Sequence, residues 1–199
     1  MNVNIKRLSP HAQIPAYAHA TDAGFDLVAS EDVIIEPGWA ELVPTGLAFE
    51  IPEGYEMQIR PRSGITLNTR LRVQLGTVDS GYRGEVGVIV DNINRYTDIE
   101  KDFLFDIRDK IVSALDYLGA WDHFAKGSYI IRKGDRIAQA VIKPVEQVVF
   151  TEVITLGDSD RGAGGFGSSG VTTKEKARRL VINETIRDNG EALKRLEDE

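Results

Sequence analysis

The sequence LGTVDSGYRGEVGVIVDN, from Leu75 to Asn92, joins a glycine-bounded turn to a strongly apolar segment. Three valines at every second position predict a β-strand that is covered on most of its sides. Gly76 and Gly81 permit backbone conformations that a side chain would exclude. We therefore expect Asp79 and Tyr82 on a tight turn held by a rigid strand, where an acid and an aromatic ring can line a pocket.

A simpler interpretation of the same stretch is a surface hairpin in which the aspartate caps a turn. Taken alone, the stretch is better explained in this way. The functional interpretation depends on the other motifs of the chain.

The composition is that of a globular protein with one domain and a small appendage, because the 199 residues are 42% hydrophobic and 28% charged. The net charge of −7 argues against general nucleic-acid binding, so any anion site must be local and built from a few arginines. The chain has no cysteine and only three scattered histidines, which argues against disulfides, thiolate metal sites and histidine metal sites.

Neither a secretion signal nor a membrane span is expected. The N-terminus MNVNIKRL lacks the apolar core of a signal peptide. No apolar segment reaches the roughly 20 residues that a transmembrane helix needs. We predict a cytoplasmic protein that contacts neither membrane nor nucleic acid.

The first half of the chain alternates like β-structure. A short strand is expected at Val3–Leu8 and a second near Gly24–Val28, where Asp26 lies among apolar residues. This carboxylate either faces water from an edge strand or is presented to a cation. The alternation from Leu47 to Ile59 predicts a hairpin with one solvated face.

The hairpin leads to the sequence RPRSGI, from Arg60 to Ile65. Pro61 should end the strand. Arg62, the hydroxyl of Ser63 and backbone N–H groups beside Gly64 could together hold phosphate oxygens. By itself such a triplet is usually no more than a turn.

The pattern changes after Asn92. Apolar residues from Ile99 to Leu118 recur at steps of three and four, and Thr97–Glu100 forms a capping box, so an amphipathic helix ending near Gly119 is expected. It would lie in a helical insertion covering about residues 96–127. The helix either packs on the sheet for stability or docks a partner protein.

Strands are expected again at Ser128–Ile131, Arg136–Ile142 and Val148–Leu156. Gln139, on the second of these, is either a satisfied core amide or a ligand donor, and the residues alone favour the former.

Residues 157–170 are rich in glycine and serine, which by composition indicates a flexible linker. Arg161 and Phe166 suit instead an arm that closes over a ligand, with the guanidinium on phosphate and the ring on a base. Residues 171–199 begin with a second capping box, and they are expected to form one or two charged helices.

Five ordered stretches resemble the motifs of the deoxyuridine triphosphatase (dUTPase) family: Ala23–Leu27, Pro61–Gly64, Gly76–Glu85, Gly134–Gln139 and Arg161–Gly170. The resemblance implies an all-β, distorted jelly-roll β-barrel over residues 1–156, assembled as a homotrimer, with the glycine-rich arm 157–170 supplied to a neighbour's active site. The implied reaction is Mg²⁺-dependent hydrolysis of dUTP to dUMP and pyrophosphate, with water attacking the α-phosphorus. Such an enzyme limits uracil incorporation into DNA and supplies dUMP for dTMP synthesis.

The resemblance also implies a role for each matching residue. Asp79 would orient the attacking water, Tyr82 would lie under the deoxyribose, and Asp26 would hold Mg²⁺ through water. Backbone groups of a hairpin around Val73–Gly84 would read uracil. The implied substrate-binding residues are Arg62, Ser63, Gly64, Gly76, Val78, Tyr82, Gln139, Arg161, Gly165, Phe166, Gly167 and Ser168.

The chain departs from the family pattern in three places. Val73 occupies the position at which some members have an asparagine that contacts uracil. The insertion resembles those of dUTPases from Gram-positive bacteria and their phages, some of which bind regulatory proteins. The residues that follow the arm are also unusual. Two alternatives therefore stay open: a related dCTP deaminase, and a regulatory protein that docks a partner through the insertion.

Overall fold

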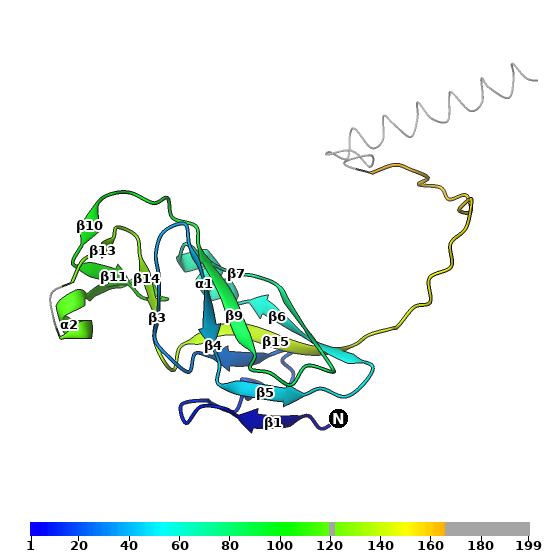
Figure 1. Ribbon diagram of the computed structural model, residues 1–199, viewed down its shortest axis with the longest axis horizontal. Helices are drawn as coiled ribbons and strands as arrows, with labels where there is room; N and C mark the ends of the chain where they lie inside the picture. Colours follow the sequence, from blue (N-terminus) through cyan, green and yellow to red (C-terminus); the bar gives the residue numbers. More distant parts are fainter. Residues whose placement is uncertain (120–121, 166–199) are drawn as a thin grey trace, which may run out of the picture. The chain divides into compact units, whose positions relative to one another are not determined.

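The computed structural model describes residues 1–119 and 122–165 (Figure 1). Its first compact unit is Met1–Val148, and the second unit begins at Val149. Every helix and strand of the described residues belongs to the first unit. No helix in the described part of the chain is long and apolar enough to cross a membrane.

The first unit is built almost entirely of antiparallel strands. One sheet has the order β2(Phe25–Val28), β15(Arg136–Pro144), β6(Tyr55–Pro61), β8(Gly76–Asp79). A second sheet has the order β4(Ala40–Pro44), β9(Gly87–Asn92), β7(Leu71–Val73). A two-stranded sheet pairs β1(Asn4–Arg7) with β5(Leu47–Glu50). Most neighbours are distant in sequence, as in jelly-roll folds.

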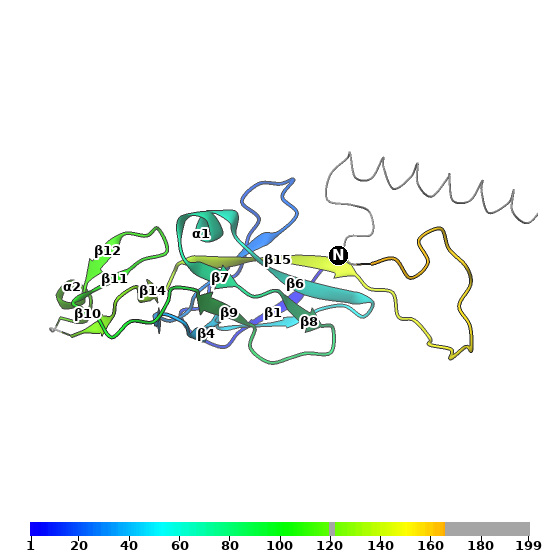
Figure 2. The ribbon, with the colours of Figure 1, turned by 90° about the horizontal axis from the view of Figure 1, so that it is seen from above.

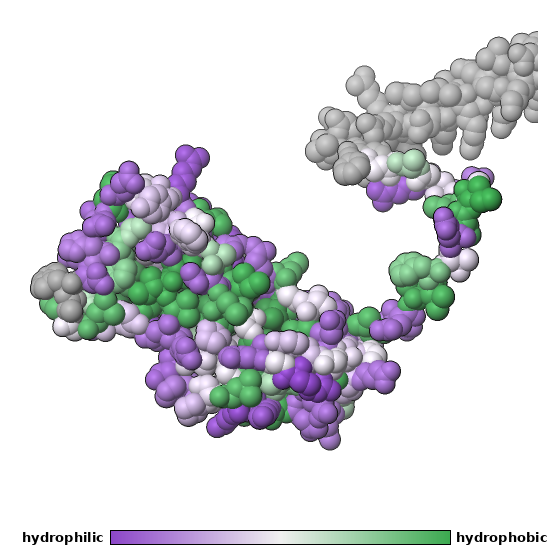
Figure 3. Space-filling view, in the orientation of Figure 1, coloured by the Kyte–Doolittle hydropathy of each residue, from purple (hydrophilic) through white to green (hydrophobic). Residues whose placement is uncertain are grey.

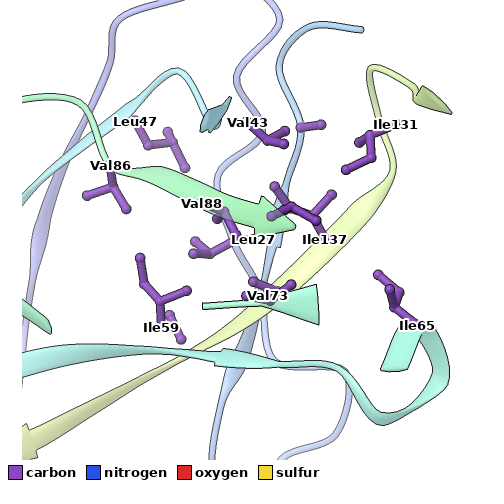
Figure 4. Close-up of a cluster of buried hydrophobic side chains, with 14 of the residues drawn as sticks. Leu27, Val43, Leu47, Ile59, Ile65, Val73, Val86, Val88, Ile131 and Ile137 are labelled. Carbon is purple, nitrogen blue, oxygen red and sulfur yellow. The ribbon is translucent and has the colours of Figure 1, made fainter. Parts of the chain in front are cut away.

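One core holds these sheets together. Figure 4 shows the side chains of Leu27, Ile59, Val73, Val88 and Ile137 converging from five different strands. Four of these five are at most 5% exposed, and Val73 is 8% exposed. Burial of this apolar surface, at roughly 25 cal/mol per Å², is what favours the closed arrangement.

The expected all-β class is confirmed, but several strand pairings and boundaries differ from prediction. The segment from Leu47 to Ile59 is no hairpin, because β5 pairs with β1 while β6 pairs with β15 and β8. The predicted hairpin around Val73–Gly84 is also wrong, because β7 pairs with β9 and β8 with β6. The alternation of apolar and polar residues determines which face of a strand is buried, but it does not determine which strand will pair with it.

Three further expectations about strands and helices need correction. The strand β9 is covered on one face only, since Ile89 is 49% exposed between buried valines. No strand forms between Val148 and Leu156. A helix, α1(Ser63–Asn68), was missed because its first residues suit a turn equally well. The helices expected in residues 171–199 lie outside the described residues.

Most of the helix predicted from Ile99 to Leu118 is wrong, and the insertion is mainly β-structure (Figure 2). Only the last turn of the predicted segment is helical, and it ends at Gly119 as expected. It contains β10(Glu100–Lys101), β11(Phe103–Phe105), β12(Ile111–Ser113), α2(Ala114–Leu118) and β13(Phe124–Ala125). Strands β12 and β11 extend a sheet through β14(Tyr129–Ile131) to β3(Val33–Ile35). The insertion therefore shares a sheet with the rest of the unit.

A turn around Asp106 explains why the helical spacing failed. The carboxylate of Asp106, which is 4% exposed, accepts hydrogen bonds from the backbone N–H groups of Arg108 (2.8 Å) and Lys110 (2.9 Å). Asp109 then has a φ of 60°, which ends any helical path. These hydrogen bonds from backbone N–H groups to the Asp106 side chain hold the turn that reverses the chain direction between β11 and β12.

We expect Asp106→Ala to destabilise the insertion by about 1–3 kcal/mol, because two N–H groups of the turn lose the buried carboxylate that accepts their hydrogen bonds. Burial raises the pKa of Asp106, but the hydrogen bonds from Lys110 and Arg108 outweigh it, so the pKa is lowered overall. A lowered pKa stabilises the fold above the unfolded value of about 3.9. The difference between wild type and variant should therefore shrink as the pH falls below about 4.

Urea unfolding followed by circular dichroism measures this difference. Asp98→Ala, at an exposed position of the same insertion, is the matched control. Equal stability of Asp106→Ala and Asp98→Ala at pH 7 would contradict the proposed role of the turn.

Candidate active site

The predicted phosphate-binding residues gather where three strands of one sheet lie side by side. Gln139 on β15 is in register with Asp26 on β2 and with Arg60 on β6. Arg62 follows the end of β6, and its Nε lies 3.1 Å from Oδ1 of Asp26. Its Nη1 also donates to the backbone oxygen of Arg136 at 2.9 Å. A carboxylate, a guanidinium and an exposed amide are thus brought together.

Arg136 is a member of this group that the sequence analysis did not single out. Its Nη1 lies 3.3 Å from Oδ2 of Asp26, so that the carboxylate is held between two guanidinium groups. The pairing of β15 with β2 shifts register between Arg136 and Ala138, and such a bulge redirects side chains. From the sequence, the only sign of this role was that Arg136 lies in the same motif as Gln139.

The turn before β15 is held by its own hydrogen bonds. Gly134 has a φ of 93°, a conformation that favours glycine. The backbone N–H of Arg132 donates to Oδ2 of Asp135 at 2.9 Å. Burial raises the pKa of Asp135. This turn fixes the point at which β15 starts, and with it the positions of Arg136 and Gln139.

Ser63 and Gly64 begin the short helix α1, beside Arg62. The first N–H groups of a helix have no partner within it, and no side chain caps this helix. A Cβ added at Gly64 would meet nothing within 4 Å. A ligand oxygen can therefore approach the backbone closely at this point.

Asp79 and Tyr82 form a second group, on the turn that follows β8. The N–H of Tyr82 donates to the backbone oxygen of Asp79 at 3.1 Å, which confirms the expected tight turn. A pocket of about 320 Å³ lies between β8 and β9, and its wall includes Gly76, Val78, Asp79 and Tyr82. Gly76 is close-packed, since a Cβ there would lie 3.2 Å from Ile59.

The far side of this turn is tied to the chain near β5. Oε1 of Glu85 accepts a hydrogen bond of 2.7 Å from the N–H of Gly46. The hydroxyl of Thr45 donates to the backbone oxygen of Val86, and the N–H of Val86 donates to Leu47 at 2.8 Å. The turn therefore holds its shape although Asp79 itself is exposed.

The ring of Tyr82 is placed by Gly84. The Tyr82 hydroxyl donates to the backbone oxygen of Glu85 at 2.9 Å, which folds the ring across the turn. A Cβ added at Gly84 would lie 2.4 Å from that hydroxyl oxygen. The residue at position 84 must therefore be glycine for the ring to lie where it does.

We expect Gly84→Ala to displace the Tyr82 ring and to lower kcat/KM by about 10²-fold, the scale of a misplacement near 1 Å. Steady-state kinetics with dUTP, the substrate that the resemblance implies, measures this effect, and thermal unfolding checks that the variant is folded. Gly81→Ala is the matched control, since a Cβ there meets nothing within 4 Å. Similar kinetics for both variants would rule out the positioning role of Gly84.

The two groups lie at opposite ends of β6 within one chain. Asp79 is in register with Glu56, near the start of β6, whereas Arg62 follows its last residue. The offset of six positions from Glu56 to Arg62 corresponds to about 20 Å along the strand. The structure therefore does not bring Asp79 together with Arg62 in a single chain.

The predicted arm residues fall in the second unit or outside the described residues. Arg161 and Gly165 belong to the second unit, where Nε of Arg161 donates to the backbone oxygen of Gly164 at 2.7 Å. Phe166, Gly167 and Ser168 lie outside the described residues.

The available side chains suit a metal ion that is held mainly by water molecules and by the bound substrate. Within residues 1–119 and 122–165, no three acidic or histidine side chains gather as a metal site. Asp26 supplies a single carboxylate beside the phosphate-binding residues. Mg²⁺ commonly keeps several waters and binds through one or two carboxylates plus substrate phosphates. Asp26 can therefore assist such an ion, but the described side chains cannot enclose it.

Comparison with known proteins gives a consistent result. The dUTPase family model matches residues 10–102 and 123–170, and its gap covers most of the insertion. Deoxyuridine 5'-triphosphate nucleotidohydrolases from Solibacter usitatus and Helicobacter hepaticus are 43% and 44% identical to the chain, over 85% and 87% of it and 97% and 92% of their own lengths.

Solved structures of phage enzymes are also similar. The dUTPase of Staphylococcus bacteriophage 80alpha with dUpNHpp is 36% identical, with a TM-score of 0.79 over 85% of this chain and 99% of that one. It is described in work on phage dUTPases that control transfer of virulence genes by a G protein-like mechanism. A mutant dUTPase from phage phi11 of S. aureus, which has a structural Mg(II) ion, gives 30% identity and a TM-score of 0.72, over 79% of this chain and 100% of that one. The fold is the jelly-roll-like fold of these enzymes, and the chain belongs to the dUTPase family.

Proposed function

We propose that this protein hydrolyses dUTP to dUMP and pyrophosphate at sites shared between copies of the chain. The observation that carries this proposal is that two complementary groups lie at opposite ends of β6. One is an acid and a ring beside a pocket, and the other is an arginine–carboxylate–amide group suited to phosphates. The family relationship supports the reaction itself.

In this mechanism Asp79 accepts a hydrogen bond from the attacking water and directs it at the α-phosphorus. A positioned carboxylate of this kind contributes about 10²–10⁴-fold to the rate. Tyr82 lies against the deoxyribose, where its ring leaves no room for a ribose 2′-hydroxyl. The pocket between β8 and β9 receives uracil. Backbone groups of these segments recognise the base, although β7 and β8 do not pair as a hairpin.

Arg62 and Gln139 bind the triphosphate together with Ser63 and the free N–H groups beside Gly64. Arg62 already pairs with Asp26, so phosphate oxygens would share its guanidinium with that carboxylate. Mg²⁺, when bound, would neutralise the charge of the leaving pyrophosphate. Asp26 would accept hydrogen bonds from the water molecules of the ion. Positioning and neutralisation of charge account for most of the rate in such phosphoryl chemistry.

Two surfaces favour a homotrimer as the shared assembly. Leu42 and Ile89 are register partners on β4 and β9 and are 61% and 49% exposed. Figure 3 shows apolar surface on one face of the first unit. In the second unit, Val149, Phe150 and Ile154 are each more than 90% exposed. Apolar surface of this extent is typical of protein contacts. The arm with Arg161, Gly165, Phe166, Gly167 and Ser168 would close the neighbour's site.

Pyrophosphate release from purified protein tests the function, with dUTP, dCTP, dTTP and UTP compared in the presence of Mg²⁺. We expect release from dUTP alone, because Tyr82 excludes ribose and the narrow pocket excludes the thymine methyl group. Ammonia release from dCTP would instead support the deaminase alternative. Absence of both activities would refute the proposal.

A regulatory role through the insertion is a second candidate, and it can coexist with hydrolysis. Its β12–α2 segment exposes Ile111, Leu115 and Leu118, which are 66%, 38% and 44% exposed. Such a patch suits a protein partner. Ile111→Asp together with Leu118→Asp should abolish partner binding and leave dUTP hydrolysis unchanged. Undiminished capture of the partner by this variant would remove the docking role.

A further inference from the structure

A cavity of about 380 Å³ lies at the base of the insertion, apart from both groups of candidate active-site residues. Its wall combines Phe103 and Phe105 of the insertion with Arg70, which follows α1, and with Arg95 and Lys126 from the segments that join the insertion to the body. The proposed hydrolysis makes no use of any of these residues.

One wall of the cavity is aromatic. Phe103 and Phe105 lie two positions apart on β11 and therefore share a face, whereas Leu104 on the opposite face is completely buried in the insertion's own core. The two phenylalanine rings meet edge to face at 5.6 Å, and Phe105 lies 5.7 Å from the ring of Tyr129. Both phenylalanines remain only half-buried, so a flat ring can pack on them from the cavity.

The lining also carries cations. Arg70, Arg95 and Lys126 line the cavity and are all exposed, and within the described part of the chain none of them forms an ion pair. The carboxylate of the lining, Asp109, accepts a hydrogen bond of 2.7 Å from the Tyr129 hydroxyl. A lining with three cations and one carboxylate gives the cavity a positive potential that attracts anions.

We propose that this cavity is a second binding site, for a small organic anion that joins a flat ring to a phosphate or carboxylate. The ring packs on Phe103 and Phe105, and the anionic group accepts hydrogen bonds from Arg95 and Lys126. The volume is near the lower end of small-molecule pockets, about 300–1,000 Å³. The ligand is therefore of mononucleotide size or smaller.

Phenyl phosphate is the probe, and isothermal titration calorimetry on the full chain is the measurement. The titrations use an Arg62→Ala background, which removes phosphate binding at the candidate active site and makes the result independent of the proposed function. We expect phenyl phosphate to bind at least about tenfold more tightly than inorganic phosphate or phenol alone, since each half supplies one wall contact.

In the same background, Arg95→Ala and Lys126→Ala should each weaken phenyl phosphate binding about tenfold, the scale of one hydrogen bond between charged groups. Arg83→Ala, at an exposed arginine outside the cavity, is the matched control and should bind normally. Circular dichroism verifies that the variants are folded.

Three results would overturn the proposal. The first is no binding of phenyl phosphate at about 10 mM. The second is equal affinity for phenyl phosphate and inorganic phosphate. The third is an affinity that neither Arg95→Ala nor Lys126→Ala changes relative to Arg83→Ala.

Discussion

Asp79→Asn should retain dUTP binding and reduce kcat by about 10²–10⁴-fold, the contribution of a positioned general base. The amide has almost the shape of the carboxylate but cannot accept a proton from water at neutral pH. Asp79 is exposed at the end of β8, and no side-chain hydrogen bond holds its carboxylate among the described residues, so the substitution should leave the fold intact. Single-turnover hydrolysis measures the chemical step, and calorimetry with a non-hydrolysable dUTP analogue measures binding.

Glu56→Gln is the matched control, because Glu56 is the register partner of Asp79 on β6. It makes the same chemical change at the same level of the sheet and should keep nearly all activity. Substantial turnover by Asp79→Asn, or an equal loss in Glu56→Gln, would show that Asp79 is not the group that activates water.

Mixing two inactive variants should restore activity, and this is the second large effect. Asp79→Asn lacks the acid and Arg62→Ala lacks the phosphate contact. Because about 20 Å of β6 separates these positions in one chain, the proposed active site takes them from different copies. In the proposed trimer, random mixing then leaves one intact pair in about a quarter of the sites. Activity should rise from near zero to about a quarter of the wild-type value.

The double variant Asp79→Asn/Arg62→Ala, mixed with wild type, provides the control. Each copy of the double variant lacks both the Asp79 carboxylate and the Arg62 guanidinium, so mixing it with wild type can only lower the activity. Denaturation and joint refolding are needed to exchange subunits, and dUTP hydrolysis is the readout. Absence of recovery after verified exchange would mean that one chain builds each site alone.

The strand character of the body could be predicted from the residues alone, and the motifs indicated the site chemistry. Period-two alternation in β2 and β6 reports local burial, which depends on the residues of one strand only. The turn at Asp79–Tyr82 was also predictable, since Asp, Ser and Gly are typical turn residues. The family motifs named Asp26, Arg62 and Gln139, and the structure places these three together.

Only the tertiary structure decided which strands pair, and this changed the interpretation of the insertion and of the site. The spacing from Ile99 to Leu118 suited a helix, but pairing of β11 with β14 and the turn at Asp106 favour strands. Arg136 reaches Asp26 because a register shift redirects it. The separation of Asp79 from Arg62 follows from the pairing of β8 with β6. Such pairings depend on free energy gained between distant segments, which no local pattern contains.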